Sequence, residues 1–359
     1  IGCTLKNKKY GWDVAVIPNR SHDLIREIDL IEEIARLIGY DRFDLNLPNP
    51  IKPGKLSSEQ LALRKVKNGF TENGFNEVLS YSLVPEDNEK LIKISNPLLL
   101  ETSCLRDNIW KEHLEIVNRN IKAGQKSCFI FEIGNVLQKK TEFIQEEVLN
   151  GAIYGNRKFG KWIISGKDND LNYYEARGKL KEALSSLNIK IDDKPTDSID
   201  FLHPGRTAKL VIEGKEAGYF GEIHPKLILE KKSLNKVYLF CIKVSNLLGA
   251  STRKNKWIPI FKQYPIVPKM ERDINFVFNK KFLISEITSQ IRKTGKNLLE
   301  DVNLIDVFED SKFGDDHISY TFRLSYRDKD KTLLDSDITS IHSNIISNVE
   351  KSFNTKLRN

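Results

Sequence analysis

The first segment of the chain carries apolar residues at helical spacing. They recur at intervals of one, three or four positions: Leu30, Ile31, Ile34, Leu37 and Ile38. This spacing predicts a helix, and Gly39 predicts its end. The following stretch, 47–54, contains three prolines and one glycine within eight residues, which favours an extended connector. We therefore predict a first domain over residues 1–46.

A second unit opens with a helical pattern and continues with strand-like runs. From Ser57 onwards, Ala62, Val66 and Phe70 share one helical face, and Gly74 stops the pattern. Runs rich in β-branched and aromatic residues predict strands at 77–83, 91–95, 128–137, 148–154, 207–213, 216–222 and 237–244, with helices at 107–121 and 172–187. Tight turns between several strands favour a largely antiparallel sheet. We predict an α+β domain over residues 57–250.

The last hundred residues follow a basic connector at 253–257 and show the most readable order of elements. The pattern predicts strands at 273–278, 302–308, 318–326 and 355–358 and helices at 283–293 and 337–352. The order β-α-β-β-α-β is that of a ferredoxin-like fold. We therefore predict a third domain over residues 262–359 and an α+β, multidomain fold class for the chain.

Composition narrows the class of protein. The 359 residues are 40% hydrophobic and 30% charged, which suits folded cores and excludes global disorder. Apolar runs are far shorter than the roughly 20 residues of a membrane span, so we expect no membrane insertion. A net charge of +8 favours a polyanionic partner. Cys3, Cys104, Cys128 and Cys241 lie far apart, which predicts reduced thiols of a cytoplasmic protein and neither a zinc site nor disulfides.

Four carboxylates form the sharpest polar cluster. Asp29, Glu32 and Glu33 lie three and four positions apart on one helix face, and Asp23 precedes them. Oxygen ligands without cysteine would suit Mg²⁺. Spacing alone favours the simpler interpretation, because acids in the first turn of a helix are stabilised by its dipole.

Catalytic chemistry has little support in the residues. His203 and His224 each precede a proline, so turn geometry explains them at least as well as general-base chemistry, and His342 falls on the terminal helix. Glycine-rich phosphate-binding motifs are missing from the sequence. We predict no catalytic residue, and an independent enzyme that uses His203 or His224 remains an alternative.

The terminal domain carries little net charge for a domain that binds RNA. Residues 262–359 contain 16 Lys and Arg and 15 Asp and Glu, so the net charge is +1. Alternation along 318–326 directs the aromatic side chains of that strand towards the helices, so we expect an open sheet face of polar groups without an aromatic platform. The candidate RNA contacts on this domain are Arg272, Asn275, Ser319, Thr321 and Arg323.

Several short motifs occur together along the chain. They are Arg-Ser-His-Asp-Leu at 20–24, Ser-Asn-Pro-Leu at 95–98, Phe-Glu-Ile-Gly-Asn-Val at 131–136, His-Pro-Gly-Arg at 203–206, Gly-Glu-Ile-His-Pro at 221–225, Tyr-Pro-Ile-Val at 264–267 and Thr-Leu-Leu-Asp at 332–335. In combination they resemble the β subunit of bacterial phenylalanine-tRNA ligases, from its middle to its C-terminus. Because the chain opens without Met, we expect a piece of a longer polypeptide.

The resemblance implies roles that the residues alone leave open. Asp23, Asp29, Glu32 and Glu33 fall on positions that supply a Mg²⁺ site in that family. The middle domain resembles an inactive relative of the class II synthetase core, while the catalytic α subunit binds ATP. The last domain resembles the family's ferredoxin-fold anticodon-binding domain.

The implied function is support of the ATP-dependent attachment of phenylalanine to tRNA(Phe). The chain would scaffold the α subunit in a tetramer of two α and two β subunits and bind tRNA, without catalysing a step itself. A stand-alone RNA-binding or regulatory paralogue is the alternative.

Overall fold

The computed structural model describes residues 1–47, 53–87, 89–139, 142–155, 170–230, 236–253, 261 and 263–358. The chain divides into two compact units, Ile1–Trp257 and Ile258–Asn359. Most of the connectors expected at 47–54 and 253–257 lies outside the described residues, so the domain limits remain predictions.

The N-terminal segment is a hairpin followed by a helix. Strands β1 (Thr4–Lys8) and β2 (Gly11–Ala15) pair antiparallel, and short 3₁₀ turns η1 (Pro18–Arg20) and η2 (Tyr40–Arg42) flank helix α1 (Glu27–Ile38). The backbone N–H groups of Ile25 and Arg26 donate to the Asp29 carboxylate, which satisfies donors at the helix start. Gly39 follows the helix with a φ of 97°, a conformation that favours glycine. The predicted helix and its end are confirmed.

The middle part is built on a seven-stranded sheet in the order β3-β7-β8-β12-β11-β10-β9. Its strands are β3 (Asn76–Glu77), β7 (Ser127–Lys139), β8 (Phe143–Gly155), β9 (Ile191–Pro195), β10 (Leu202–Ile212), β11 (Lys215–Ile223) and β12 (Val237–Lys243). All neighbouring pairs are antiparallel except β3 with β7. The expectation of a largely antiparallel sheet is confirmed.

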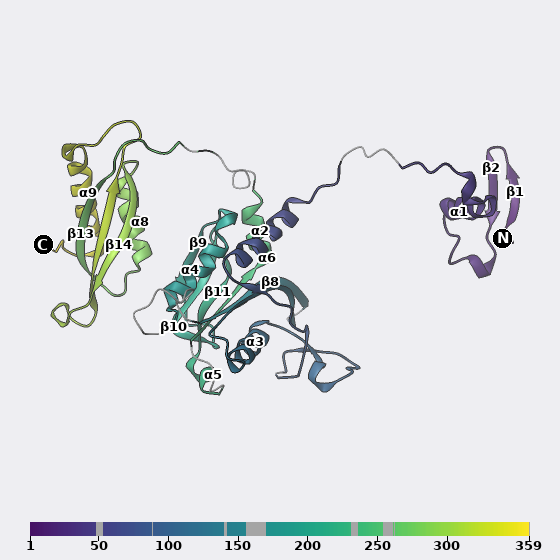
Figure 1. The fold of residues 1–359 in the computed structure, drawn as a ribbon, viewed down its shortest axis with the longest axis horizontal. Coiled ribbons are helices and arrows are strands. Elements are labelled where there is room, and N and C mark those ends of the chain that lie inside the picture. Colours follow the sequence, from purple (N-terminus) through teal and green to yellow (C-terminus); the bar gives the residue numbers. More distant parts are fainter. Residues whose placement is uncertain are drawn as a thin grey trace. The chain divides into compact units, whose positions relative to one another are not determined.

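Helices cover both faces of this sheet (Figure 1). One face packs against α2 (Ser58–Glu72), α4 (Tyr173–Ala183) and α6 (Val244–Ser251), with η4 (Ser185–Leu187) following α4. The other face packs against α3 (Trp110–Lys122) and α5 (Pro225–Glu230). Because side chains of a strand alternate between faces, Phe131 enters the first core and Ile130 the second.

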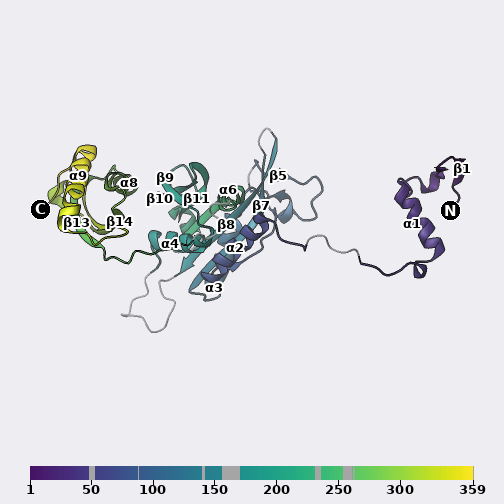
Figure 2. The same cartoon turned by 90° about the horizontal axis from the view of Figure 1, so that it is seen from above.

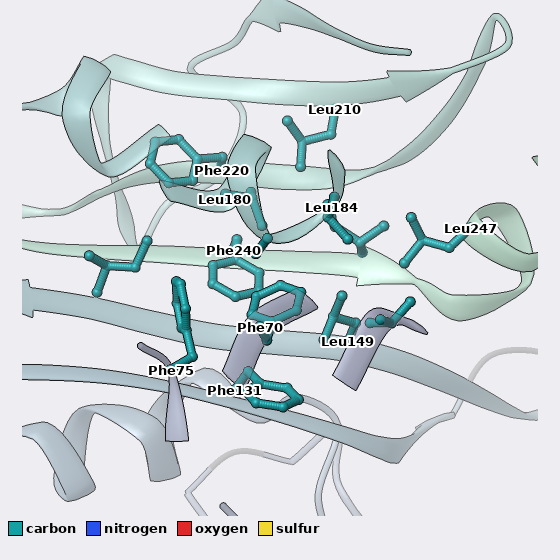
Figure 3. Close-up of a cluster of buried hydrophobic side chains, with 14 of the residues drawn as sticks. Phe70, Phe75, Phe131, Leu149, Leu180, Leu184, Leu210, Phe220, Phe240 and Leu247 are labelled. Carbon is teal, nitrogen blue, oxygen red and sulfur yellow. The ribbon is translucent and has the colours of Figure 1, made fainter. Parts of the chain in front are cut away.

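Stacked aromatic rings fill the first core (Figure 3). The Phe70 ring lies 4.8 Å from that of Phe131 and 5.6 Å from that of Phe240, measured between centroids. Gly151 on β8 leaves room for them, since a Cβ there would come within 2.2 Å of the Phe240 ring. Close packing of these rings therefore joins α2 to the sheet.

The segment between β3 and α3 departs from the strand predicted at 77–83, whereas the strand predicted at 91–95 is present but shorter, as β5 (Ile92–Lys93). It forms a separate small sheet in the order β4-β6-β5, from Leu83–Val84, Cys104–Leu105 and Ile92–Lys93, with η3 at Leu100–Thr102. Ser80 leaves the main sheet because its N–H and hydroxyl both donate to the Glu132 side chain, at 3.1 and 2.6 Å. The continuous strand predicted at 77–83 is therefore wrong.

The terminal unit has two layers, with α8 (Ile284–Gly295) and α9 (Asp335–Phe353) on one side of a sheet (Figure 2). The strands β13 (Met270–Asn279), β14 (Leu299–Phe308) and β15 (His317–Tyr326) lie in the order β13-β15-β14, and η5 (Ser311–Phe313) follows β14. The predicted ferredoxin-like order is confirmed, but its last strand at 355–358 is reduced to one bridge between Phe276 and Leu357.

The structure also bears on two expectations from composition. All four cysteines are free in the structure. In the part of the chain that is described, helices are too short or too polar to cross a bilayer.

Candidate functional site

The polar residues predicted on the terminal sheet are brought together by strand pairing. Asn275 of β13 lies opposite Thr321 of β15. The Asn275 amide donates to the Thr321 hydroxyl at 2.9 Å and accepts from the Ser319 hydroxyl at 2.8 Å. These three side chains form one hydrogen-bonded row on the face opposite the helices.

This face is less open than expected. Ser319 is only 1% exposed, because Phe308 pairs with it across the sheet and Arg358 Nη1 lies 3.5 Å from its hydroxyl. The expectation of a freely exposed Ser319 is therefore wrong. Thr321 and Asn275 keep partial exposure.

Both arginines predicted to contact RNA have carboxylate partners. Arg323 donates two hydrogen bonds to Asp273, at 2.9 and 2.8 Å, and this pairing lowers the pKa of Asp273. Arg272 forms an ion pair with Asp335. Their charges are largely neutralised within the domain.

An aromatic and cationic cluster at the end of β14 was missed by the sequence reasoning. The Arg358 guanidinium lies 5.8 Å from the Phe308 ring centroid and 5.0 Å from that of Phe313. The two rings meet edge to face at 6.2 Å. The expected absence of aromatic side chains from this face is wrong at this edge.

A β-bulge in β14 explains why the alternation of side chains between the two sheet faces does not continue to Phe308. The register of β14 against β15 shifts between Leu304 and Asp306, and an extra residue reverses the face of every later side chain. Phe308 consequently leaves the core face and pairs with Ser319. The signal that could have predicted this is the acidic residue Asp306 at a position that strict alternation assigns to the core.

The four N-terminal carboxylates are engaged mainly by arginines. Arg20 donates to Asp23 and, at 2.7 Å, to Glu33, and Arg36 binds the second oxygen of Glu33. Asp29 forms an ion pair with Arg26 at 3.0 Å, and it also accepts hydrogen bonds from the backbone N–H groups at the start of α1. Glu32 is exposed on the helix.

These contacts affect the suitability of the cluster for a metal. Hydrogen bonds from arginine side chains lower the pKa of Asp29 and Glu33, so both remain anionic. The all-oxygen donor set fits a hard cation such as Mg²⁺. Among the described residues, three or more ligands are not gathered around one point, so an ion would have to displace arginine contacts.

The middle domain contains a buried charge network. Arg106 and Glu132, 3% and 1% exposed, form an ion pair at 2.9 Å. Arg106 also donates to the Ser80 hydroxyl and to the Asn135 carbonyl, and His113 Nε2 lies 3.4 Å from Glu132. Burial lowers the pKa of His113, so its ring is neutral at pH 7.

The buried network around Arg106 and Glu132 stabilises the packing of the middle domain. Burial opposes ionisation of Glu132, but the nearby His113 ring, hydrogen bonds from Ser80 and the charge of Arg106 leave its pKa lowered. Gly134 is required beside it, since a Cβ there would come 2.5 Å from Arg106 Nη2. Glu132 and Gly134 belong to the motif at 131–136. This motif therefore has a structural role in the middle domain.

The histidines that were candidates for catalysis make local contacts in strand β10, before α5 and on α9. His203 Nδ1 accepts from the Gly205 N–H at 3.0 Å and His224 Nδ1 accepts from the Lys226 N–H at 3.2 Å. His342 Nδ1 lies 3.0 Å from the Tyr326 hydroxyl. His203 lies in strand β10, at an irregular stretch of its pairing with β11, so the turn predicted there is wrong. His224 lies in the connection that directly precedes α5.

Comparison with known families identifies three matching models in order along the chain. They are described as tRNA synthetase B5 domain over residues 1–40, Phenylalanyl tRNA synthetase beta chain CLM domain over 47–244, and Ferredoxin-fold anticodon binding domain over 265–358.

Curated relatives carry the name phenylalanine-tRNA ligase beta subunit. Those of Prochlorococcus marinus strain MIT 9312, Prochlorococcus marinus subsp. pastoris strain CCMP1986 and Synechococcus sp. strain CC9605 are 88%, 70% and 43% identical over all of this chain. The chain spans only 44% to 45% of their length. A pyrrolysyl tRNA synthetase structure from Desulfitobacterium hafniense covers 53% of this chain and 65% of its own, with 11% identity and a TM-score of 0.40, too low to carry an inference.

Proposed function

The chain belongs to the phenylalanyl-tRNA synthetase beta-chain family, and we propose that it acts as the middle and C-terminal part of a phenylalanine-tRNA ligase β subunit. The observation that carries this proposal is the succession of three domain matches over 1–40, 47–244 and 265–358. The relatives named above are β subunits, which supports a subunit of a complex over a stand-alone paralogue.

Within the complete enzyme, the partner α subunit attaches phenylalanine to tRNA(Phe) at the expense of ATP, and this chain makes no covalent step. The buried Arg106–Glu132 pair supports this division of roles, because its atoms are engaged in internal contacts. The contribution of the chain is positioning, since holding tRNA at a remote site orients its reactive end. We propose that the assembly is a cytoplasmic tetramer of two α and two β subunits.

The terminal domain binds the tRNA anticodon region through the open face of its sheet. Unpaired bases stack on aromatic rings and on arginine planes, and Phe308, Phe313 and Arg358 supply both at one edge. Asn275 and Thr321 add hydrogen-bonding groups beside them. Arg272 and Arg323 contribute less, because Asp335 and Asp273 already neutralise them.

Mg²⁺ is held by Asp23, Asp29, Glu32 and Glu33 when the subunits are assembled. Asp23 Oδ2 and both oxygens of Glu33 are held by arginines in the structure, so the ion competes with Arg20 and Arg36. When bound, it supplies fixed positive charge on this helix.

Co-expression of the complete β subunit with the α subunit tests the proposal. We expect a stable complex with the mass of two copies of each and charging of tRNA(Phe) with phenylalanine only when both are present. A β subunit that stays alone in the presence of the α subunit would refute it.

A further inference from the structure

A cavity of about 580 Å³ lies against the main sheet of the middle domain, on the face that carries α3. Three neighbouring strands form its floor, where Asn150 of β8 pairs with Cys241 of β12, and Cys241 pairs with Tyr219 of β11. Residues that pair across antiparallel strands direct their side chains to the same face. These three side chains therefore form one row along the floor of a cavity whose volume is typical of small-molecule sites.

The asparagine of this row is buried and has a hydrogen-bond donor to spare. Asn150 is 1% exposed, and its Oδ1 accepts from the Gly151 N–H at 2.9 Å. Within the described part of the chain this is the one hydrogen bond of its side chain, so Nδ2 has no acceptor there. Buried polar groups nearly always have a partner, which indicates that a ligand in the cavity would supply the acceptor.

Aromatic side chains form one wall of the cavity. Trp110 and Phe201 stack with their centroids 4.4 Å apart and their planes at 8°, and Phe201 meets Tyr219 edge to face at 5.6 Å. All three residues line the cavity and keep part of their surface exposed. Flat rings bind to such side chains by stacking, so the wall favours an aromatic ligand over an aliphatic one.

The charged residues of the lining disfavour an anionic ligand. They are three acids, Asp107, Glu146 and Glu216, and two lysines, Lys209 and Lys243, which together give a net charge of −1. Lys243 pairs with Glu146 at 2.8 Å and Lys209 with Glu216 at 3.0 Å. Because both lysines are already neutralised, a phosphate or carboxylate would bring an uncompensated charge into the cavity.

We infer that this cavity binds a small neutral heteroaromatic molecule of the nucleoside type. Its ring stacks against the wall of Trp110, Phe201 and Tyr219, and a ring nitrogen or carbonyl oxygen accepts from Asn150 Nδ2. A nucleotide fits less well than a nucleoside, because its phosphate would find both lysines engaged. The site is separate from the proposed function and adds a small-molecule site to the middle domain.

Equilibrium dialysis of the 359-residue chain against adenosine, uridine and AMP tests the inference. Both nucleosides should bind, and AMP should bind more weakly than adenosine. Asn150→Leu should weaken nucleoside binding about tenfold, because a buried hydrogen bond is lost. Asn135→Leu is the matched control and should bind unchanged, because Asn135 is exposed on the neighbouring strand β7.

A second variant tests the role of charge. Glu146→Gln together with Glu216→Gln leaves one acid and two lysines in the lining, a net charge of +1. This change should raise the affinity for AMP relative to that for adenosine. An unchanged ratio of the two affinities would overturn the assignment of a neutral ligand.

The side-chain amide signals in nuclear magnetic resonance spectra keep the test independent of variant folding. Adenosine added to the natural chain should shift the side-chain amide signal of Asn150 and leave that of Asn135 unchanged. The inference would be overturned by an unshifted Asn150 signal, by AMP that binds the natural chain as tightly as adenosine, or by phenylalanine that binds where nucleosides do not. Each of these results would leave the proposed function intact, since that function is tested by the complex with the α subunit.

Discussion

Replacement of Glu132 by glutamine tests the buried network of the middle domain. The substitution keeps the shape of the side chain but removes the charge that faces Arg106 at 2.9 Å. Arg106 is 3% exposed, so water cannot compensate, and breaking a buried ion pair in this way costs about 3–5 kcal/mol. Glutamine can still accept a hydrogen bond from Ser80, which places the expected loss near the lower limit, about 3 kcal/mol.

Urea unfolding followed by circular dichroism measures the loss. Glu147→Gln is the matched control, because Glu147 is exposed on the neighbouring strand β8, and it should change the free energy of unfolding by less than about 0.5 kcal/mol. Adding Arg106→Met to Glu132→Gln should restore part of the stability, since no unpaired charge then remains buried. A loss below about 1 kcal/mol for Glu132→Gln alone would contradict the reasoning, because such a value is typical of an exposed pair.

Three further predictions concern pH, RNA and metal. Burial lowers the pKa of His113 in the folded state, so the free energy of unfolding should fall as the pH drops below about 6.5, by up to about 1.4 kcal/mol per pH unit. His113→Gln should flatten this pH dependence when unfolding is measured at pH 5.5 to 7.5. An unchanged slope would exclude His113 as the source of the dependence. Phe308→Ala and Arg358→Ala should each weaken tRNA binding by about 1 kcal/mol and Arg323→Ala by less, as measured by titration of the assembled enzyme; equal losses at all three positions would contradict the assigned stacking. Asp29→Asn together with Glu32→Gln should weaken Mg²⁺ binding to the assembled enzyme in calorimetric titration. An unchanged titration would mean that these acids only stabilise the start of the helix.

The fold was predictable wherever one local pattern decides the structure. The helix over Glu27–Ile38 ends at Gly39 and the helix over Ser58–Glu72 begins after Ser57, whose hydroxyl accepts from the Gln60 N–H. The strands of the main sheet could be predicted because both faces are buried, which makes them continuous apolar runs.

Prediction failed where a distant side chain redirects the backbone. Nothing local distinguishes 77–83 from a strand, and only Glu132, more than fifty positions later, draws Ser80 out of the sheet. In the same way the shift between Leu304 and Asp306 reverses the face of Phe308. Asn275, Ser319, Thr321 and Arg323 share one sheet face, but Arg272 pairs with the core residue Leu324 and lies on the opposite face. Neither the burial of these residues nor their ion pairs could be predicted from alternation.

The distribution of ion pairs separates the parts of the surface that hold the chain together from those available to partners. Arg323 with Asp273 and Arg20 with Asp23 neutralise each other within the described residues, so exposed charge at these places adds little attraction. Arg358 is placed against two rings and a hydroxyl. This cation is suited to an RNA, so raising the salt concentration should weaken that association. The loss of Arg358 should therefore weaken RNA binding more than the loss of Arg323, whose charge Asp273 already neutralises.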